Sequence, residues 1–447
     1  MKKTILFLTF SFHIIGFGSS AFTVLKDSLS MQQISGIFGE KNYGFTKNTL
    51  EFGNWALRET NRDTAWVKVG GAFRLNTIYT YYEGQTFPLG TELRNDWTWD
   101  TWRLNIDSYS KGLQFSFEYR FYPTFNTHFI KYGWIGYRFK DESNLQFGIT
   151  QVPFGLLTYA SHSWWFQTPY YVGLEDDHQI GFNYLYPLGN WMFNVAYFPL
   201  SEPRGTNETS FGELSSARYS YDVIPVEGNS NIERNQFNMR AAYKLTSGEI
   251  GVSVQKLQIY NLATENLGSQ TAFAAHYEQD YGRWNLKSEV LYYNYNNVRN
   301  NDGDLLEVVQ MGAYGFGSYD VASEAAMYVV GLAYNLPVDL GPVSHVQFYN
   351  DYTYTQKFST TLINEQSMKF APTQQNVLGA LVTAGKIFAY FDIAAGYNHP
   401  WISDSFGGNA LGSGRGEDFR EAIGDHNPIA GNPGWNIRFN INLGYYF

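Results

Sequence analysis

Four arginines are the charged residues whose spacing suggests a shared role, namely Arg74, Arg103, Arg120 and Arg438. Each occupies a polar position in a segment where apolar and polar residues alternate, so all four side chains would point to the same face of a sheet. A row of fixed positive charge along a water-filled passage attracts anions, and opposite a negative surface it orients dipolar solutes. Alternatively, these arginines pair with inward-facing Asp107, Glu118 or tyrosine hydroxyls and keep the wall hydrated.

Aromatic and acidic residues are concentrated in one long connection, residues 152–177. Its aromatic residues are Trp164, Trp165, Phe166, Tyr170 and Tyr171, and the acidic run that follows them is Glu175, Asp176 and Asp177. The aromatic rings could form a surface along which a planar or sugar-like solute slides, or they could pack the segment against a wall or join an aromatic girdle. The carboxylates could face the arginines across a passage, or they could cap the start of the next strand.

The sequence patterns of known catalytic sites do not occur in this chain. Its histidines are scattered, and none belongs to an HExxH, P-loop or GxSxG pattern. Nucleophilic catalysis needs a nucleophile beside a base, and no such pair is evident. The run from Asn301 to Asp304 with Glu307 resembles a calcium-binding loop but lacks the full set of ligand positions, which favours a solvated turn. The sequence therefore predicts no enzyme, no cofactor and no metal site.

The end of the chain indicates which elements would position these residues. From Trp435 to Phe447, apolar residues occupy every second position, and polar or small residues such as Arg438 and Asn440 lie between them. A period of two places the two sets on opposite faces of one strand. A transmembrane barrel strand needs about ten residues with this alternation and aromatic residues near its ends. The same alternation recurs earlier in the chain, with hardly any helical period between the segments.

Short turns and long connections alternate along the sequence. Short turns are expected near residues 110–112, 141–143, 187–190, 246–248, 280–282, 336–342 and 384–386. Longer connections are expected at 83–97, 123–128, 152–177, 200–233, 261–270, 296–321, 356–373 and 399–433. This order predicts an all-β fold, a transmembrane antiparallel β-barrel of about 16 strands with long extracellular loops and short periplasmic turns. The four arginines would then lie on the first three strands and the last, which become neighbours when the barrel closes.

The amino-terminal residues have the features of an export signal. Lys2 and Lys3 precede an apolar run that ends near Phe17, and a small-residue cleavage site follows it. We expect a signal peptide at 1–21, an N-terminal periplasmic lead-in at 22–63 and a β-barrel porin domain at 64–447. The first clear strand is expected at 64–82.

Composition narrows the class of protein further. The chain of 447 residues contains 18% aromatic and only 16% charged residues, which suits a barrel with one face on lipid and the other on water. It has no cysteine, so disulfide bonds and thiolate metal sites are excluded. The formal net charge of −10 argues against nucleic acid as a partner.

Residues 131–155 resemble a known family. The stretches Lys131 to Phe139 and Gln146 to Gly155 are similar to a strand pair and loop of the phosphate-selective porin O and P family. Tyr171 to His178 is similar to members from Bacteroidetes. The resemblance implies a homotrimer of sixteen-stranded barrels that takes up small solutes. Phosphate selectivity does not carry over, because Gln151 replaces the family's lysine and the chain is acidic.

We therefore expect an outer-membrane porin for passive diffusion of small hydrophilic solutes, localised to the bacterial outer membrane. Its water-filled pore would be narrowed by the 152–177 loop, with the four arginines as a basic strip along the pore wall. Outer-membrane lipid and lipopolysaccharide would surround a homotrimer. The alternative is a substrate-specific or gated outer-membrane transporter for a sugar or an anion, and an outer-membrane barrel enzyme is less favoured.

Overall fold

The computed structural model describes residues 65–81, 97–207, 216–315, 318–363, 366–399, 402 and 435–447. In these ranges sixteen strands form the wall of a barrel. They are β1 (Trp66–Tyr81), β2 (Trp97–Ser110), β3 (Leu113–Tyr122), β4 (Thr127–Arg138), β5 (Asn144–Gln151), β6 (His178–Leu188), β7 (Trp191–Ser201), β10 (Asn231–Lys244), β11 (Gly248–Asn261), β12 (Leu267–Tyr281), β13 (Trp284–Asn296), β16 (Glu324–Leu340), β17 (Val343–Lys357), β20 (Thr373–Ala384), β21 (Ile387–Tyr397) and β22 (Trp435–Tyr446).

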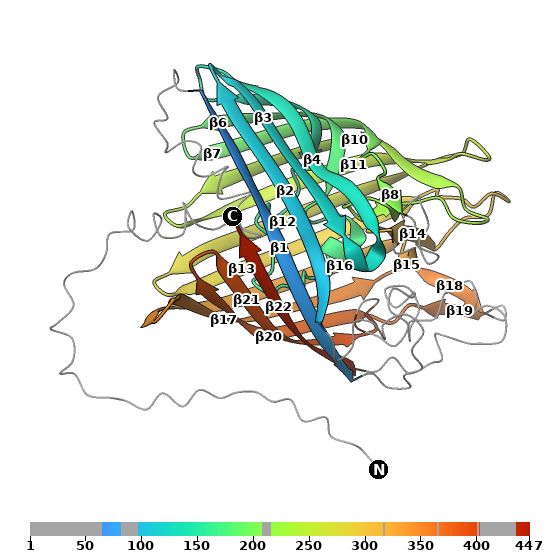
Figure 1. Cartoon of the computed structure of the whole chain (residues 1–447). Coiled ribbons are helices and arrows are strands. Elements are labelled where there is room, and N and C mark those ends of the chain that lie inside the picture. Colours follow the sequence, from blue (N-terminus) through green and yellow to red (C-terminus); the bar gives the residue numbers. More distant parts are fainter. Residues whose placement is uncertain are drawn as a thin grey trace, which may run out of the picture. The chain divides into compact units, whose positions relative to one another are not determined.

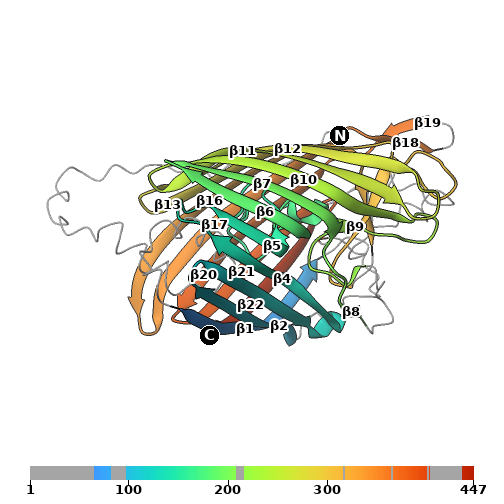
Figure 2. The ribbon, with the colours of Figure 1, turned by 90° about the horizontal axis from the view of Figure 1, so that it is seen from above.

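Every wall strand pairs antiparallel with its neighbours in chain order, and the first strand pairs with the last. In Figure 1 the blue β1 lies beside the dark red β22, and Figure 2 shows the colours of the strands changing gradually around the wall. The β1–β22 register joins Ala72 to Tyr446, and the Gly71 backbone also exchanges two 3.1 Å hydrogen bonds with Phe447. The fold is therefore a closed sixteen-stranded antiparallel barrel, as the sequence predicts.

Along the wall strands, apolar side chains on the outer face alternate with polar side chains that point into the barrel. On β1, Val67 and Val69 are 69% and 65% exposed, whereas Arg74 is only 2% exposed. On β22, Trp435 and Tyr445 are exposed, while Arg438 is buried. An outward row of large apolar side chains with a buried polar row between them is the pattern of a barrel whose outer face contacts hydrocarbon. Within the described ranges, no helix has the length and apolar character that crossing a membrane requires.

The seven predicted short turns each connect two adjacent wall strands. The described long connections leave and re-enter the wall at the opposite ends of these strands. Several long connections carry small elements of their own. β8 (Thr206–Asn207) pairs with β4, β18 (Thr360–Ile363) pairs with β19 (Gln366–Lys369), and β9 (Asp222–Val223), β14 (Val308–Gly312) and β15 (Tyr319–Ala322) form a three-stranded sheet. Within the described residues, the connections also contain the 3₁₀ turns η2 (Pro123–Phe125) and η3 (Tyr170–Val172).

Some expectations from the sequence fall outside the described residues. These are the signal peptide at 1–21, the lead-in at 22–63 and most of the connections 83–97 and 399–433. The expected strand 64–82 appears as β1, Trp66–Tyr81, within the described part of the chain.

Candidate functional site

Residues 152–177, called here the inner loop, run through the interior of the barrel between β5 and β6. Their backbone groups bond to wall strands far from both of these. Gly155 N donates to Ser253 Oγ on β11 (3.1 Å), and Leu156 N donates to Glu289 Oε1 on β13 (3.1 Å). Since inward side chains of distant strands hold it, the loop occupies the lumen instead of covering its mouth.

The second half of the inner loop reaches the opposite part of the wall. The backbone N–H of His162 donates to Asp351 Oδ2 on β17 (2.7 Å), and Gln375 Nε2 on β20 donates to Phe166 O (2.7 Å). The indole N–H of Trp165 donates to the Asn440 side chain on β22. With Arg240 Nε on β10 donating to Gly155 O (2.9 Å), the loop is bonded to β10, β11, β13, β17, β20 and β22.

Gly155 shows why this path depends on the local sequence. Its φ of +60° lies in the left-handed region, which a side chain disfavours, and an added Cβ would overlap the Glu289 carboxylate. Glycine therefore lets the chain turn inward at the point where it leaves β5 and meets the far wall.

Two other connections pack against the inner loop. The 200–233 connection contributes Tyr219 and Tyr221, and the 296–321 connection contributes Tyr314 and Tyr319, all in one buried cluster with the inner loop. The Tyr319 hydroxyl donates to the backbone carbonyl of Tyr171, and the hydroxyls of Tyr170 and Tyr314 are hydrogen-bonded to each other. Aromatic rings from three connections thus form one buried cluster that occupies part of the lumen.

A cavity remains between this aromatic cluster and one part of the wall. It encloses about 770 Å³ of space between protein atoms, part of it open to solvent. The wall side is formed by β22, β1, β2 and β3, which are consecutive around the barrel and supply Arg438, Arg74, Asp100 and Arg120. The loop side is formed by aromatic residues, among them all five that the sequence analysis singled out in the 152–177 connection: Trp164, Trp165, Phe166, Tyr170 and Tyr171.

Three arginines of the predicted basic strip therefore meet the predicted constriction loop at one cavity. The Arg438 guanidinium lies 4.4 Å from the Trp165 ring centroid, and the Arg74 guanidinium lies 6.0 Å from that of Trp164. Arg103 is buried next to Arg120 in the β2–β3 register and does not line this cavity. A guanidinium over an aromatic face is stabilised by the ring quadrupole, so these contacts hold the loop against the strip.

The arginines also have carboxylate partners on the wall. Arg74 forms an ion pair with Asp100 (2.6 Å), and Arg120 forms one with Glu118 and a hydrogen bond to Tyr122 Oη (3.2 Å). The alternative in which the arginines pair with inward carboxylates and tyrosines therefore describes Arg120 well. Pairing and cavity lining coexist, because each guanidinium has five N–H groups to donate.

The acidic run of the inner loop turns away from the cavity. Glu175, Asp176 and Asp177 are each at most 6% exposed, and none of them lines the cavity with the arginines. Asp177 O accepts the Val152 N–H (2.8 Å), which closes the base of the loop at the start of β6. This geometry matches the strand-capping interpretation of the run, and the negative group that lines the cavity is instead Asp100 on β2.

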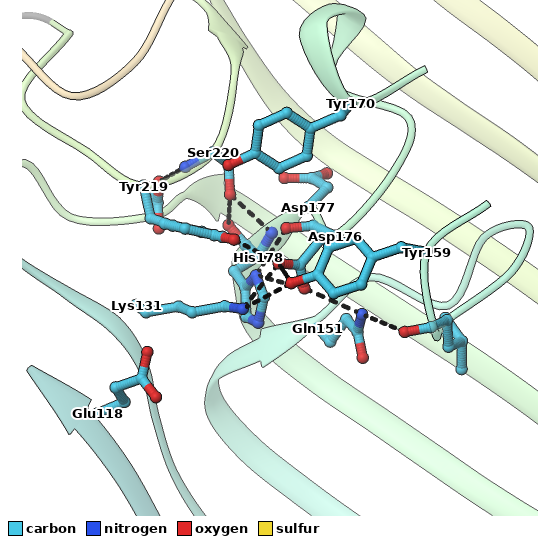
Figure 3. A network of polar contacts seen from close by, with 12 residues as sticks. Glu118, Lys131, Gln151, Tyr159, Tyr170, Asp176, Asp177, His178, Tyr219 and Ser220 are labelled. Carbon is cyan, nitrogen blue, oxygen red and sulfur yellow. Dashed lines mark hydrogen bonds and ion pairs between the residues drawn. The ribbon is translucent and has the colours of Figure 1, made fainter. Parts of the chain in front are cut away.

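Asp176 is the centre of a buried network that we call the latch (Figure 3). Its Oδ2 accepts from Lys131 Nζ on β4 (2.7 Å), from Tyr159 Oη in the middle of the loop (2.5 Å) and from the Tyr219 hydroxyl. Its Oδ1 accepts from Gln151 Nε2 at the end of β5 (3.1 Å). One carboxylate therefore joins the wall, both halves of the inner loop and the 200–233 connection.

The hydrogen bonds of the latch offset two unfavourable features, namely disfavoured backbone conformations and the burial of a carboxylate. Tyr159 and Asp176 have φ values of 69° and 51°, in the left-handed region that non-glycine residues rarely adopt. Burial alone would raise the pKa of Asp176, but the Lys131 charge and the donated hydrogen bonds hold its pKa below the usual value. The latch is therefore stable above the ordinary carboxyl pKa and is lost as pH falls through the lowered value.

A second group of buried acids joins the same connections. Four carboxylates lie together here: Asp177, Glu202, Asp222 and Glu233. Gln179 Nε2 bridges Asp177 Oδ1 (3.1 Å) and Asp222 Oδ1 (2.8 Å), and Arg218 Nη1 binds Asp222 Oδ2 (2.6 Å). Burial raises the pKa values of Asp177, Glu202 and Asp222, and repulsion from Asp222 adds to this effect for the other two.

In the described part of the chain, no three His, Cys, Asp or Glu side chains are arranged to hold a metal ion. The calcium-like run at Asn301 is a turn in which Asn300 Oδ1 accepts the backbone N–H groups of Asp302 (3.0 Å) and Asp304 (2.8 Å). Both carboxylates are exposed, as the solvated-turn interpretation expects.

Sequence reasoning missed several residues of this site, namely Asp100, Lys131, Tyr219, Tyr221 and Tyr314. Asp100 and Lys131 carry the only local signal, because each is a charged residue within a barrel strand and charges on such strands face inward. The three tyrosines lie in long connections, and nothing in their sequence context relates them to the inner loop.

Comparison with known proteins supports the same architecture. No protein-family model and no curated protein sequence matches the chain, so the resemblance to the phosphate-selective porin O and P family stays a prediction. Among solved structures, an anion-selective porin from Comamonas acidovorans aligns with a TM-score of 0.50 and 10% identity, over 86% of this chain and 100% of that one. The chain has the fold of outer-membrane porins.

Two further structures align to a similar extent. OmpF from Salmonella typhi, in complex with daunomycin, gives a TM-score of 0.50 and 10% identity over 85% of this chain and 97% of that one. In-vitro folded OmpT, an outer membrane protein of Vibrio cholerae, aligns with a TM-score of 0.50 and 11% identity. The alignment covers 86% of this chain and 98% of that one. At these identities the similarity concerns the fold alone.

Proposed function

We propose that this protein is an outer-membrane porin that lets small hydrophilic solutes diffuse through a lumen narrowed by the inner loop. The observation that carries the proposal is the bonding of this loop to inward side chains of six wall strands, since a loop held there restricts the lumen. A barrel of sixteen strands is wide enough to contain an aqueous passage, whereas one of eight strands is filled by its own side chains. Solutes would pass between the basic strip and the aromatic face of the loop.

Vesicle permeation tests this function directly. Refolded protein is inserted into liposomes, and swelling rates are measured with neutral sugars of increasing size. We expect monosaccharides to enter and larger oligosaccharides to be excluded, with a cut-off set by the narrowed lumen. A barrel that inserts and shows heat-modifiable electrophoretic mobility, but admits no solute of any size, would contradict the proposal.

A substrate-specific or gated transporter is the second candidate, and the lining of the cavity favours it. Three connections pack together on one side of the cavity, and its lining combines many aromatic rings with a few charged groups, as small-molecule binding sites do. Such a transporter would show saturation of flux with solute concentration. A general porin would show flux that rises linearly over the same range.

The outer-membrane location, the lipid contacts and the homotrimer are part of the same proposal. The exposed apolar outer face suits outer-membrane lipid and lipopolysaccharide, and a homotrimer is the assembly that the family resemblance implies. Membrane fractionation would test the location. Chemical cross-linking of the native membrane would test the trimer, with a ladder ending at three subunits as the expected result and a monomer alone as the contrary one.

A further inference from the structure

Two basic side chains point outward from the barrel wall, on the neighbouring strands β10 and β11. Lys256 occupies the same face of β11 as Val252, because side chains at every second position share a face, and both side chains are exposed. Arg234 on β10 lies opposite Gln258, which is the next outward residue of β11 after Lys256. The other basic residues of the described wall strands occupy inward positions or strand ends.

Neither cation forms an ion pair with a carboxylate of the described residues. Lys256 Nζ donates to Ser269 Oγ (3.0 Å) and Thr271 Oγ1 (2.7 Å) on β12, and an ammonium group has a third N–H to donate. The Arg234 guanidinium lies 3.6 Å from the centroid of the Tyr260 ring, and its buried Nε has no hydrogen-bond partner in this part of the chain. Both cations therefore retain donors for an external anion.

Polar side chains of two more strands continue this surface. Thr271 on β12 lies opposite Lys256 and, on its other side, opposite Asn294 on β13. We call the following residues the outer polar patch: Arg234, Lys256, Gln258, Ser269, Thr271 and Asn294. Glu324 on β16 lies opposite Asn294, three strands away from Lys256, which is about 14 Å at the usual spacing of neighbouring strands. The patch itself therefore carries positive charge and hydrogen-bonding groups without a carboxylate.

An apolar row borders the outer polar patch on the side of the short turns. Strand pairing places its four residues opposite one another in sequence around the wall, from β10 to β13: Met239, Val254, Phe273 and Tyr292. Met239 and Phe273 are 46% and 51% exposed, so the row presents apolar surface to the lipid. Cationic groups next to a hydrocarbon-facing row lie where the headgroups of lipids meet their acyl chains, and long basic side chains reach toward such headgroups.

Simpler anions and lipids would use only part of this surface. Inorganic phosphate contacts the two cations and leaves the apolar row unused. A zwitterionic phospholipid covers the apolar row but brings its own positive charge to the cations. A lipid with phosphate groups on a sugar headgroup uses every feature, because its phosphates accept from the cations, its sugar bonds to the hydroxyl and amide groups, and its acyl chains cover the apolar row.

We propose that the outer polar patch is a binding site for a phosphorylated glycolipid of the outer leaflet, with lipid A as its chemical type. Lys256 and Arg234 bind phosphate oxygens, and the acyl chains lie along the row that contains Met239 and Phe273. The inference rests on the proposed function, which places the long connections outside the cell. Lys256 lies in the half of β11 that leads to the long connection 261–270, so the patch then faces the outer leaflet. This assigns a defined site to the general contact with lipopolysaccharide.

Native mass spectrometry of the refolded protein in a non-ionic detergent tests the proposal by titration with diphosphoryl lipid A. Phosphatidylglycerol has the phosphate charge and acyl chains without the sugar, phosphatidylcholine has no net charge, and inorganic phosphate has no acyl chain. We expect lipid A to bind at least about tenfold more tightly than each of these, the scale of one charge-assisted hydrogen bond. Equal binding of phosphatidylglycerol would overturn the role of the sugar, equal binding of phosphatidylcholine that of the charge, and equal binding of phosphate that of the apolar row.

Three variants locate the site. Lys256→Gln and Arg234→Gln should each weaken binding of lipid A about tenfold or more, as expected for the loss of one charge-assisted contact. Lys244→Gln is the matched control, since Lys244 is an exposed lysine of β10 at the short-turn end of the barrel and the substitution changes the net charge by the same amount. An equal loss in Lys244→Gln and Lys256→Gln would mean that the overall charge of the protein attracts the lipid. Unchanged binding in both patch variants would place the lipid elsewhere and overturn the proposal.

The outcomes separate this inference from the porin proposal. A barrel that conducts ions but binds no lipid A would refute the lipid site and leave the porin function standing. A barrel that binds lipid A at the patch but conducts nothing would refute the porin function and leave the lipid site standing. If a variant does not fold, as shown by loss of heat-modifiable mobility, the comparison of lipids on the unaltered protein still decides the question.

Discussion

Replacement of Asp176 by Asn should release the inner loop while the barrel wall stays intact. The carboxylate is 6% exposed and accepts hydrogen bonds from Lys131, Tyr159, Tyr219 and Gln151. The substitution keeps the size of the side chain but leaves the Lys131 ammonium, 1% exposed, without its ion pair. Loss of one member of a buried pair costs about 3–5 kcal/mol, so docking of the loop should weaken by about two to four powers of ten.

Limited proteolysis of the folded barrel measures this loss. Cleavage within the inner loop should be much faster in Asp176→Asn than in the unaltered protein, and single-channel recordings should show more frequent current fluctuations. The matched control is Asp302→Asn, the same chemical change at an exposed carboxylate in another connection. The double variant Lys131→Gln with Asp176→Asn should recover part of the loss, because no unpaired buried charge remains. Proteolysis of Asp176→Asn at the rate of the Asp302 control would refute the reasoning.

Two further predictions concern the same loop. Gly155→Val should displace the start of the loop, because the valine side chain would overlap the Glu289 carboxylate and the backbone φ at this position is disfavoured for valine. Overpacking of this kind costs about 1–3 kcal/mol. Faster cleavage of the loop, with an unchanged barrel, would show this loss. Docking should also weaken as pH rises, since the raised pKa values of Asp177, Glu202 and Asp222 mean that the docked state binds protons more tightly. The contribution of these carboxyl groups to the free energy of docking is complete below the ordinary carboxyl pKa and is lost as pH increases through the raised pKa values. Loop cleavage should therefore be faster at pH 8 than at pH 5. An unchanged or opposite trend would contradict this assignment.

The barrel could be predicted from the sequence because its signals are local. Alternation on either side of Arg103 and Arg438 is visible within ten residues, and it gives both the strand and the direction of the side chain. Turns such as Lys111-Gly112 can be recognised from residue types such as glycine. Both residues of this turn have positive φ in the structure. Antiparallel neighbours joined in chain order then leave only the closure of β1 on β22, which the even number of strands permits.

The interior was less predictable because its contacts join distant parts of the chain. Lys131 and Asp176 are 45 residues apart, and Phe166 and Gln375 are 209 apart, with no shared period or motif to relate them. The aromatic residues of the inner loop were recognised, but their partners Tyr219 and Tyr314 come from other connections. Both interpretations offered for the aromatic run describe it in part, since its rings pack in a buried cluster and also line the cavity.

The central claim is that an aqueous passage remains between the basic strip and the inner loop. Conductance of the refolded protein in a planar bilayer, with the reversal potential measured under a KCl gradient, tests it most directly. We predict discrete current steps, an anion preference set by the positive lining, and a shift of the reversal potential toward cations in Arg438→Gln. A barrel that inserts fully folded and carries no current would contradict the claim.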